Sequence, residues 1–242
     1  MSHVVKVFLK LLFVIAVLGM YSVNAYATDA LSYKLPKFEL VPGMQTKWIA
    51  RQMAMNGVPM SVQAFTVKRS ADDVLNYYEH QWKTKGLARV IRNEYDGEKS
   101  IGLEHRGNYF TVQAHDSKSG SEGMLTVSQT ISDATISTDT KFPLMSGSQV
   151  MTKIDSNDFG QIAETLMVEN NHSVSSNENH FISALQNNGW VKQSYSENKN
   201  KSTGKVLNFQ KGNQLCQITI AKQAIQNGAS RTSVVVNWIK KQ

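Results

Sequence analysis

The sequence predicts an α+β fold made of two tandem copies of one small domain, each an antiparallel β-sheet with one helix packed on a face. Two observations predict it. A helix with the same start and stop signals occurs twice, 103 positions apart at Ser70 and Ser173. Each helix is followed by an apolar run, a Gly-Asn pair and a second apolar run, which is typical of a hairpin. The expected order in each copy is strand, strand, helix, strand, strand, strand.

Residues 1–27 have the pattern of a secretory signal peptide. Two lysines precede an apolar run from Leu11 to Met20, and small residues stand at Ala25 and Ala27. Cleavage is therefore expected after Ala27. Because Ser22 soon interrupts the apolar residues, the segment is too short for an uncleaved anchor. A periplasmic or secreted protein with no stable membrane anchor after cleavage is the prediction.

The first copy is expected to span residues 28–137. Two strand-like segments, 47–55 and 59–68, precede a helix that Ser70 caps and Gly86 ends. The weak alternation of these two segments does not show which side faces the core. The apolar stripe of the helix predicts its buried side chains: Ala71, Val74, Leu75, Tyr78 and Trp82.

After the helix, the Gly107-Asn108 pair predicts a hairpin, and a strand with Leu125 and Val127 closes the first copy. The next segment, 130–141, is rich in Ser, Thr and Asp and has no apolar periodicity. It is the expected linker, with the division between the copies near residue 137.

The second copy is expected to span residues 138–242 and to repeat the same order. Its helix begins after Ser173, carries Phe181 and Leu185 on the apolar side, and ends at Gly189. Strands are expected at 149–154 and 161–168 before the helix. Its hairpin and final strand are marked by Gly212-Asn213 and by Val234, Val236 and Trp238.

Charge and cysteine content narrow the functional classes. The formal net charge is +7, and it falls to +5 when Lys6 and Lys10 are removed with the signal peptide. This mild, scattered excess does not predict a nucleic-acid partner. The single cysteine, Cys216, cannot form an internal disulfide, and its place in an alternating apolar run predicts a buried thiol.

The sequence contains no catalytic or metal-binding constellation. A zinc site commonly uses a close histidine pair on one helix face, and no such pair is present. His80 and His180 lie in the two predicted helices and are expected to face solvent. There is no Gly-x-Ser-x-Gly, Walker or Gly-x-Gly-x-x-Gly motif. No catalytic residue, metal or cofactor is therefore predicted.

Six residues are the candidates for a binding surface. Tyr77 lies off the apolar stripe of its helix, and Trp48 and Trp190 stand near the ends of predicted elements. Surface aromatic side chains are favoured at interfaces. Three lysines share one polar segment and are either a solvated loop or a patch for an anionic polymer or membrane surface. These lysines are Lys199, Lys201 and Lys205.

The favoured functional hypothesis is an exported, non-enzymatic binding or scaffold protein that contacts a protein of the cell envelope, such as part of an assembly or secretion machine. Duplicated modules raise the effective concentration for a repeated partner. Two alternatives stay open. One is an enzyme or enzyme inhibitor with a cleft between the copies, and the other is a weak binder of an anionic polymer. The sequence does not specify an oligomeric state.

Overall fold

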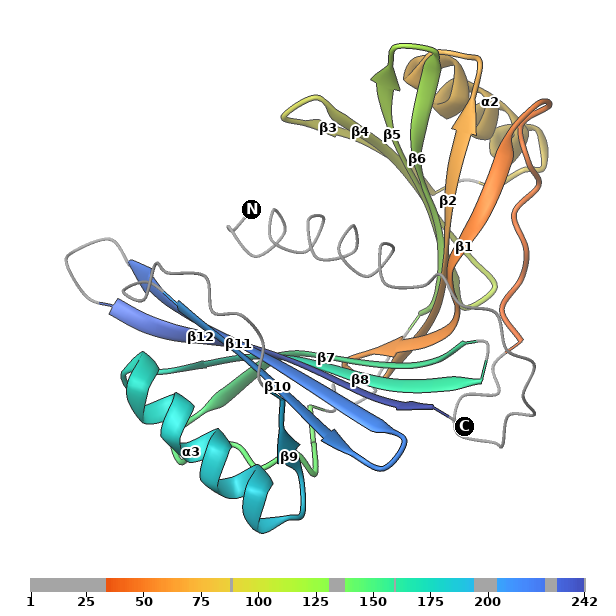
Figure 1. Ribbon diagram of the computed structural model, residues 1–242. Coiled ribbons are helices and arrows are strands. Elements are labelled where there is room, and N and C mark those ends of the chain that lie inside the picture. Colours follow the sequence, from red (N-terminus) through yellow and green to blue (C-terminus); the bar gives the residue numbers. More distant parts are fainter. Residues whose placement is uncertain are drawn as a thin grey trace. The chain divides into compact units, whose positions relative to one another are not determined.

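The structure is a computed structural model that describes residues 34–87, 89–130, 138–158, 160–193, 204–224 and 230–241. These residues form mostly antiparallel sheet with two helices, which is α+β-like or mainly β (Figure 1). The predicted antiparallel sheet with helices is confirmed at this level, and the tandem duplication stays a prediction. The predicted signal peptide and the predicted division near residue 137 lie outside the described residues.

Two compact units make up the chain. The first contains Ser32–Gln52 and Pro59–Asp133, and the second contains Met53–Val58 and Ala134–Gln242. Each unit has its own hydrophobic core and its own helix.

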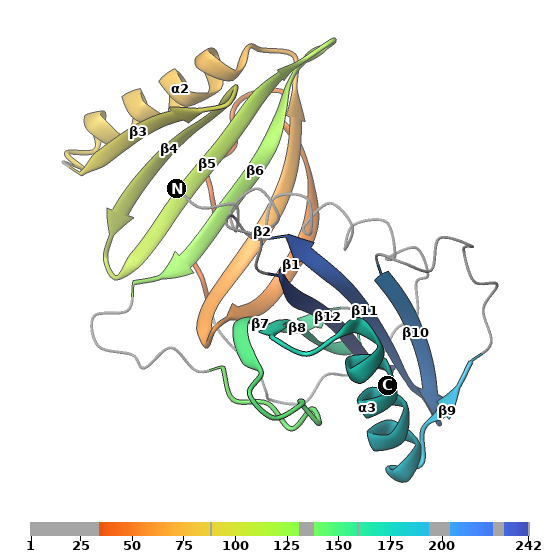
Figure 2. The same ribbon diagram turned by 90° about the vertical axis from the view of Figure 1, so that its left-hand side faces the viewer.

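In the first unit, two strands precede the helix and four follow it. The strand order is β3-β4-β5-β6-β2-β1, with antiparallel pairing wherever the register is known. The helix α2 lies against β3 to β6 (Figure 2). The elements are β1 (Gln45–Met55), β2 (Val58–Val67), α2 (Ala71–Thr84), β3 (Val90–Tyr95), β4 (Glu98–His105), β5 (Asn108–Ser117) and β6 (Gly120–Gln129).

Two-residue turns set the register of the first sheet. Arg106 and Gly107 form the turn between β4 and β5, with φ values of 48° and 72°. Asp96 and Gly97 form the turn between β3 and β4, with φ values of 55° and 79°. Positive φ at both turn residues matches the right-handed twist of the paired strands, which explains a glycine in each turn.

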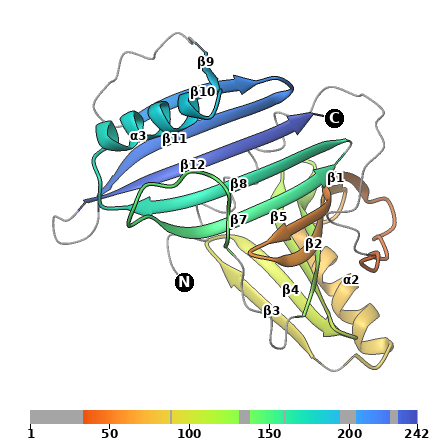
Figure 3. The ribbon, with the colours of Figure 1, turned by 90° about the horizontal axis from the view of Figure 1, so that it is seen from below.

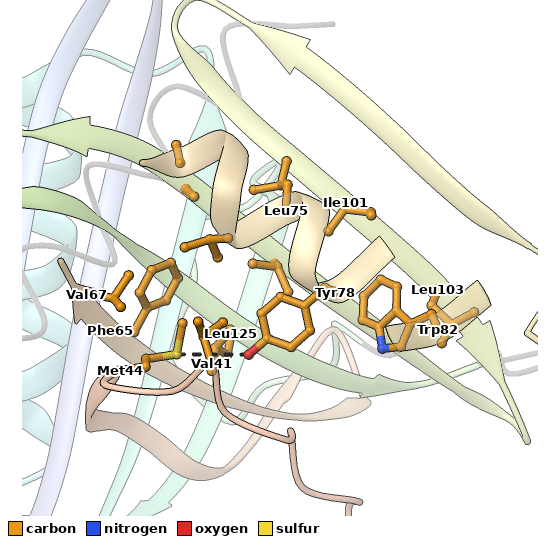
Figure 4. Packing of buried hydrophobic residues seen from close by; sticks show 14 residues of the cluster. Val41, Met44, Phe65, Val67, Leu75, Tyr78, Trp82, Ile101, Leu103 and Leu125 are labelled. Atoms are coloured by element: carbon orange, nitrogen blue, oxygen red, sulfur yellow. Dashed lines mark hydrogen bonds between the residues drawn. The ribbon is translucent and has the colours of Figure 1, made fainter. Parts of the chain in front are cut away.

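The helix α2 begins and packs as its sequence predicts. The Ser70 side chain accepts a hydrogen bond from the Asp73 amide at 3.1 Å, and the Asp73 carboxylate accepts one from the Ser70 amide at 3.4 Å. The five predicted stripe residues are all buried. Figure 4 shows three of them, Leu75, Tyr78 and Trp82, beside core residues of the sheet, and the Tyr78 hydroxyl lies 4.0 Å from the Met44 sulfur.

The second unit has the strand order β7-β8-β12-β11-β10-β9 (Figure 3). All its pairings are antiparallel. The helix α3 packs against β9, β10 and β11. The elements are β7 (Gln149–Asp158), β8 (Gln161–Asn170), α3 (Val174–Asn187), β9 (Val191–Lys192), β10 (Gly204–Lys211), β11 (Gln214–Ala224) and β12 (Ser230–Lys241).

Two buried asparagine side chains, Asn170 and Asn177, connect α3 to β8 by hydrogen bonds. The Asn170 amide nitrogen donates to the Asn177 side-chain oxygen at 2.9 Å, and the Asn177 nitrogen donates back to the Asn170 oxygen at 3.0 Å. Asn177 also donates to the carbonyl of Ser173, the residue that caps the helix, at 2.9 Å. Since Asn177 is fully buried and Asn170 is 4% exposed, these bonds satisfy groups that water does not reach.

The predicted order of elements is wrong in one respect, because four strands rather than three follow each helix. The additional strands are β3 and β9. Both are edge strands, so only one side of each is paired. Nearly every residue of β3 and both residues of β9 are exposed, and neither strand therefore has the apolar alternation that predicts a strand.

Candidate functional site

Trp48 lines a surface cavity of about 140 Å³ in the first unit. It lies in β1 and is half-buried. The segment before β1 forms one wall, and residues of β2 and β6 form another. The apolar side chains at the cavity are Pro36, Phe38, Leu40, Leu125 and Val127, and Leu40 is 42% exposed. Thr46, Ser61 and Gln63 also line the cavity, which is thus a mostly apolar hollow with an indole and an aliphatic side chain at its surface.

One cationic side chain lines this cavity, and a second lies over the Trp48 ring. The Arg51 guanidinium carbon lies 5.8 Å from the centre of the Trp48 ring, a cation–π arrangement. Lys37 lines the cavity, is exposed and forms no ion pair with any described residue. The carboxylate of Glu39, two residues after Lys37, is bound to Lys85 at 2.6 Å. A ligand with an apolar group and a nearby carboxylate fits this combination.

Tyr77 does not belong to the Trp48 cavity. It is half-buried on α2 and packs against the first core, with its ring edge-on to Tyr78 at a centroid distance of 5.5 Å. This contact gives Tyr77 a packing role, and a binding role for it stays a prediction.

Trp190 is buried rather than exposed. Its side chain is 8% exposed and packs on Trp238 in the second core, with ring centroids 6.0 Å apart. It follows Gly189, the glycine after the end of α3, and the turn at this glycine directs the ring into the second core instead of into solvent. The exposure expected from its place at an element end is therefore not found.

Of the three candidate lysines, only Lys205 is among the described residues. Its ammonium group lies 3.6 Å from the Glu178 carboxylate on α3. Lys205 therefore has an acidic neighbour that lowers its attraction for an anionic polymer. Lys199 and Lys201 lie outside the described residues, and their role stays a prediction.

The sequence reasoning missed the residues that complete the Trp48 cavity. Pro36, Phe38 and Leu40 lie in an irregular segment before the first strand, where no periodic element was expected. The signal was present in the alternation of apolar and charged residues from Pro36 to Leu40. Such alternation indicates a segment that places one side against the protein.

Among the described residues, no group of three His, Cys, Asp or Glu side chains could hold a metal ion. His115 lies between Glu98 and Glu122 at 3.4 and 3.1 Å, an exposed cross-strand pairing with no adjoining nucleophile in the described part of the chain. His80 is exposed as expected, whereas His180 is half-buried and bonds to the Pro143 carbonyl at 3.0 Å.

Cys216 is buried, as the sequence predicts. It is 2% exposed, and burial raises the pKa of its thiol from 9.0 to about 12. Alkylation with iodoacetamide at pH 8 is expected to be at least about a hundredfold slower in the native protein than in guanidinium, because the thiolate is rare and shielded. Mass spectrometry would measure the rates, with Cys216→Ala as the unlabelled control.

The same pKa shift has a consequence for stability. The thiol binds its proton more tightly in the folded than in the unfolded state, so its contribution to stability is complete below about pH 9 and is lost as the pH rises towards 12.

In the alkylation experiment described above, rapid alkylation of Cys216 in the native protein at pH 8 would contradict its buried position.

No protein family, curated protein sequence or solved structure matches this chain. In the part of the chain that the structure describes, neither helix is long and apolar enough to cross a membrane.

Proposed function

We propose that this chain is an exported, non-enzymatic binding protein of the cell envelope, built from two copies of one domain, and that it holds a protein partner at the Trp48 cavity. The observation that carries the proposal is the half-buried Trp48 in a mostly apolar hollow that Lys37 also lines, with the Arg51 guanidinium over the Trp48 ring.

Several features support the duplication. Both units have the order strand, strand, helix and four strands, and corresponding strands take the same places in the two sheet orders. Ser70 and Ser173 cap helices of 14 residues each. The helices end before Gly86 and Gly189, which have φ values of 72° and 79°. A repeated ancestral domain accounts for all of these at once.

The size and lining of the cavity favour an apolar side chain as its occupant. A cavity of roughly 150 Å³ lined by apolar groups accepts a molecule as large as benzene. The Trp48 cavity is of comparable volume, at about 140 Å³. Tryptophan is enriched among the residues that dominate the binding energy of protein interfaces, particularly beside pockets.

The charges favour an acidic partner. Lys37 at the cavity has no acidic partner among the described residues, and Arg51 lies over Trp48. A carboxylate next to the inserted apolar group would meet Lys37, which adds specificity and speeds association. The partner is therefore a protein with an apolar side chain beside Asp or Glu.

The two alternatives receive less support from the described residues. The buried thiol and the lack of a metal-binding group offer nothing to an enzyme mechanism. The anionic-polymer hypothesis depended on three lysines, of which Lys205 is close to Glu178.

The test is crosslinking of the exported protein in its native envelope, followed by titration of the captured protein against purified variants. Trp48→Ala is expected to raise the dissociation constant at least about tenfold, because it removes the aromatic wall of the cavity. Tyr109→Ala is the matched control, since Tyr109 is an aromatic residue of the same unit, is 43% exposed and does not line the cavity.

Equal affinity of Trp48→Ala and the unaltered protein would refute the cavity as the binding site. Failure to capture any saturable envelope partner would refute the proposed function. The intact mass of the exported protein would show whether residues 1–27 have been removed.

A further inference from the structure

A second surface cavity lies in the first unit, where β2 ends and β6 begins. Its volume is about 280 Å³. Thr66, Lys68 and Arg69 line it on one side, and Ser119 and Ser121 line it on another. It shares no lining residue with the Trp48 cavity. Its lining mixes polar and apolar groups, and it includes two cationic side chains and three hydroxyl groups beside Pro42 and Val67.

One of these hydroxyl groups has no hydrogen-bond partner. Ser121 is 1% exposed, and its Oγ atom is buried without a donor or acceptor near it. A buried polar atom without a partner is unfavourable, so native proteins rarely keep one without a reason. Two other described side-chain atoms are also buried without a hydrogen-bond partner, Thr130 Oγ1 and Asn157 Oδ1. Neither residue lines one of the two cavities.

The second unit shows how such a hydroxyl group is satisfied within the chain. Ser121 pairs with Val67, three residues before the cap of α2, and Thr232 pairs with Asn170, three residues before the cap of α3. The Thr232 hydroxyl donates to the His172 carbonyl at 2.6 Å. In the first unit Val67 replaces the amide residue, the Ser121 hydroxyl makes no hydrogen bond with a described residue, and Ser121 is among the residues that line the cavity.

No described residue neutralises the positive charges of the two cations at the cavity, Lys68 and Arg69. Lys68 and Arg69 are both exposed, and neither forms an ion pair within the described part of the chain. The nearby carboxylates have other partners. Asp116 accepts from the Ala71 amide at 2.7 Å, and Asp72 binds Arg92 at 2.6 Å. An anionic ligand would therefore meet two available positive charges.

We propose that this cavity binds a phosphate group, either free or as the terminal phosphate of a larger molecule. A tetrahedral phosphate presents several oxygen atoms, and arginine, lysine and hydroxyl donors can satisfy them from different directions. A carboxylate has only two oxygens and would leave donors unused. The Ser121 hydroxyl would donate to one phosphate oxygen, and its Oγ atom would then have a hydrogen-bond partner. This site is separate from the proposed protein-binding cavity and does not depend on it.

Isothermal titration of the whole exported protein with inorganic phosphate and with glycerol 3-phosphate tests the proposal for soluble ligands. Saturable binding is expected, with Arg69→Ala weakening it at least about tenfold and Ser121→Ala at least about fivefold. Because the Ser121 hydroxyl has no partner in the protein, Ser121→Ala should not lower the melting temperature. Lys222→Ala, an exposed lysine of the second unit, removes the same charge elsewhere and should not change binding.

Sedimentation with vesicles distinguishes a lipid phosphate from a soluble one. Binding to phosphatidic acid vesicles but not to phosphatidylcholine vesicles, lost in Arg69→Ala and Ser121→Ala, would assign the site to a phospholipid headgroup. Absence of binding to every phosphate probe would overturn the proposal, as would an equal loss of binding in Lys222→Ala. Trp48→Ala should bind phosphate normally, so failure at either cavity can be recognised independently of the other.

Discussion

Replacing Gly123 with alanine is expected to lower the free energy of unfolding of the first unit by about 3 kcal/mol or more. Gly123 lies in β6 and pairs with Ala114 of β5 and Phe65 of β2. A Cβ atom at this position would collide with the carbonyl oxygen of Gln113 and lie 2.9 Å from the Cα atom of Ala114. Both are backbone atoms of a central strand, so relief requires β5 and β6 to move apart.

Gly102→Ala is the matched control for this effect. Gly102 lies in β4 of the same sheet, and the nearest atom to its added Cβ is the Phe110 carbonyl oxygen at 3.8 Å, an ordinary contact. The free energy of unfolding of the Gly102→Ala variant should differ from that of the unaltered protein by less than about 1 kcal/mol. Guanidinium unfolding, followed by circular dichroism and tryptophan fluorescence, would compare the two. Equal stability of both variants would show that β5 and β6 are not as closely packed as described.

Asn177→Ala is expected to lower the free energy of unfolding of the second unit by about 3 kcal/mol. The substitution removes two hydrogen bonds with Asn170 and one with the Ser173 carbonyl. Asn170, at 4% exposure, would lose both side-chain bonds to α3 while remaining buried. The loss of unfolding free energy should therefore exceed the loss caused by removing a solvent-exposed hydrogen bond.

Asn187→Ala provides the comparison on the same helix. Asn187 is the last residue of α3 and is exposed, and the change should alter stability by no more than about 0.5 kcal/mol. The readout is the midpoint of guanidinium unfolding of each purified protein. A similar small effect for Asn177→Ala would contradict the buried amide pair.

The helices were predictable because their signals are local. A serine cap, a glycine after the last turn and an apolar stripe all lie within one short stretch, so Ser70, Gly86 and Tyr78 could be interpreted without knowing the rest of the fold. The hairpin of β4 and β5 was predictable for the same reason, although its turn residues are Arg106 and Gly107 rather than Gly107 and Asn108.

Other features depend on partners far away in the chain. The strand β3 has mostly exposed residues, and only its pairing with β4 and the Asp96-Gly97 turn reveal it. That Asp-Gly pair was a usable signal that the apolar pattern obscured. The cavity at Trp48 combines β1 with β6, and the unpaired hydroxyl of Ser121 becomes visible only when its surroundings are known. Neither follows from residue spacing.

The sheet orders also determine how each unit reaches its folded state. Most neighbouring strands are joined by short turns and can form early as hairpins. The pairing of β2 with β6, and that of β8 with β12, instead joins strands on opposite sides of the helix in sequence, from Val67 to Ser121 and from Asn170 to Thr232. Closing these long chain loops loses entropy before the contacts form. We therefore expect docking of the strand pair that precedes each helix to be the slow step of folding, with one edge of the earlier hairpins unpaired until it occurs.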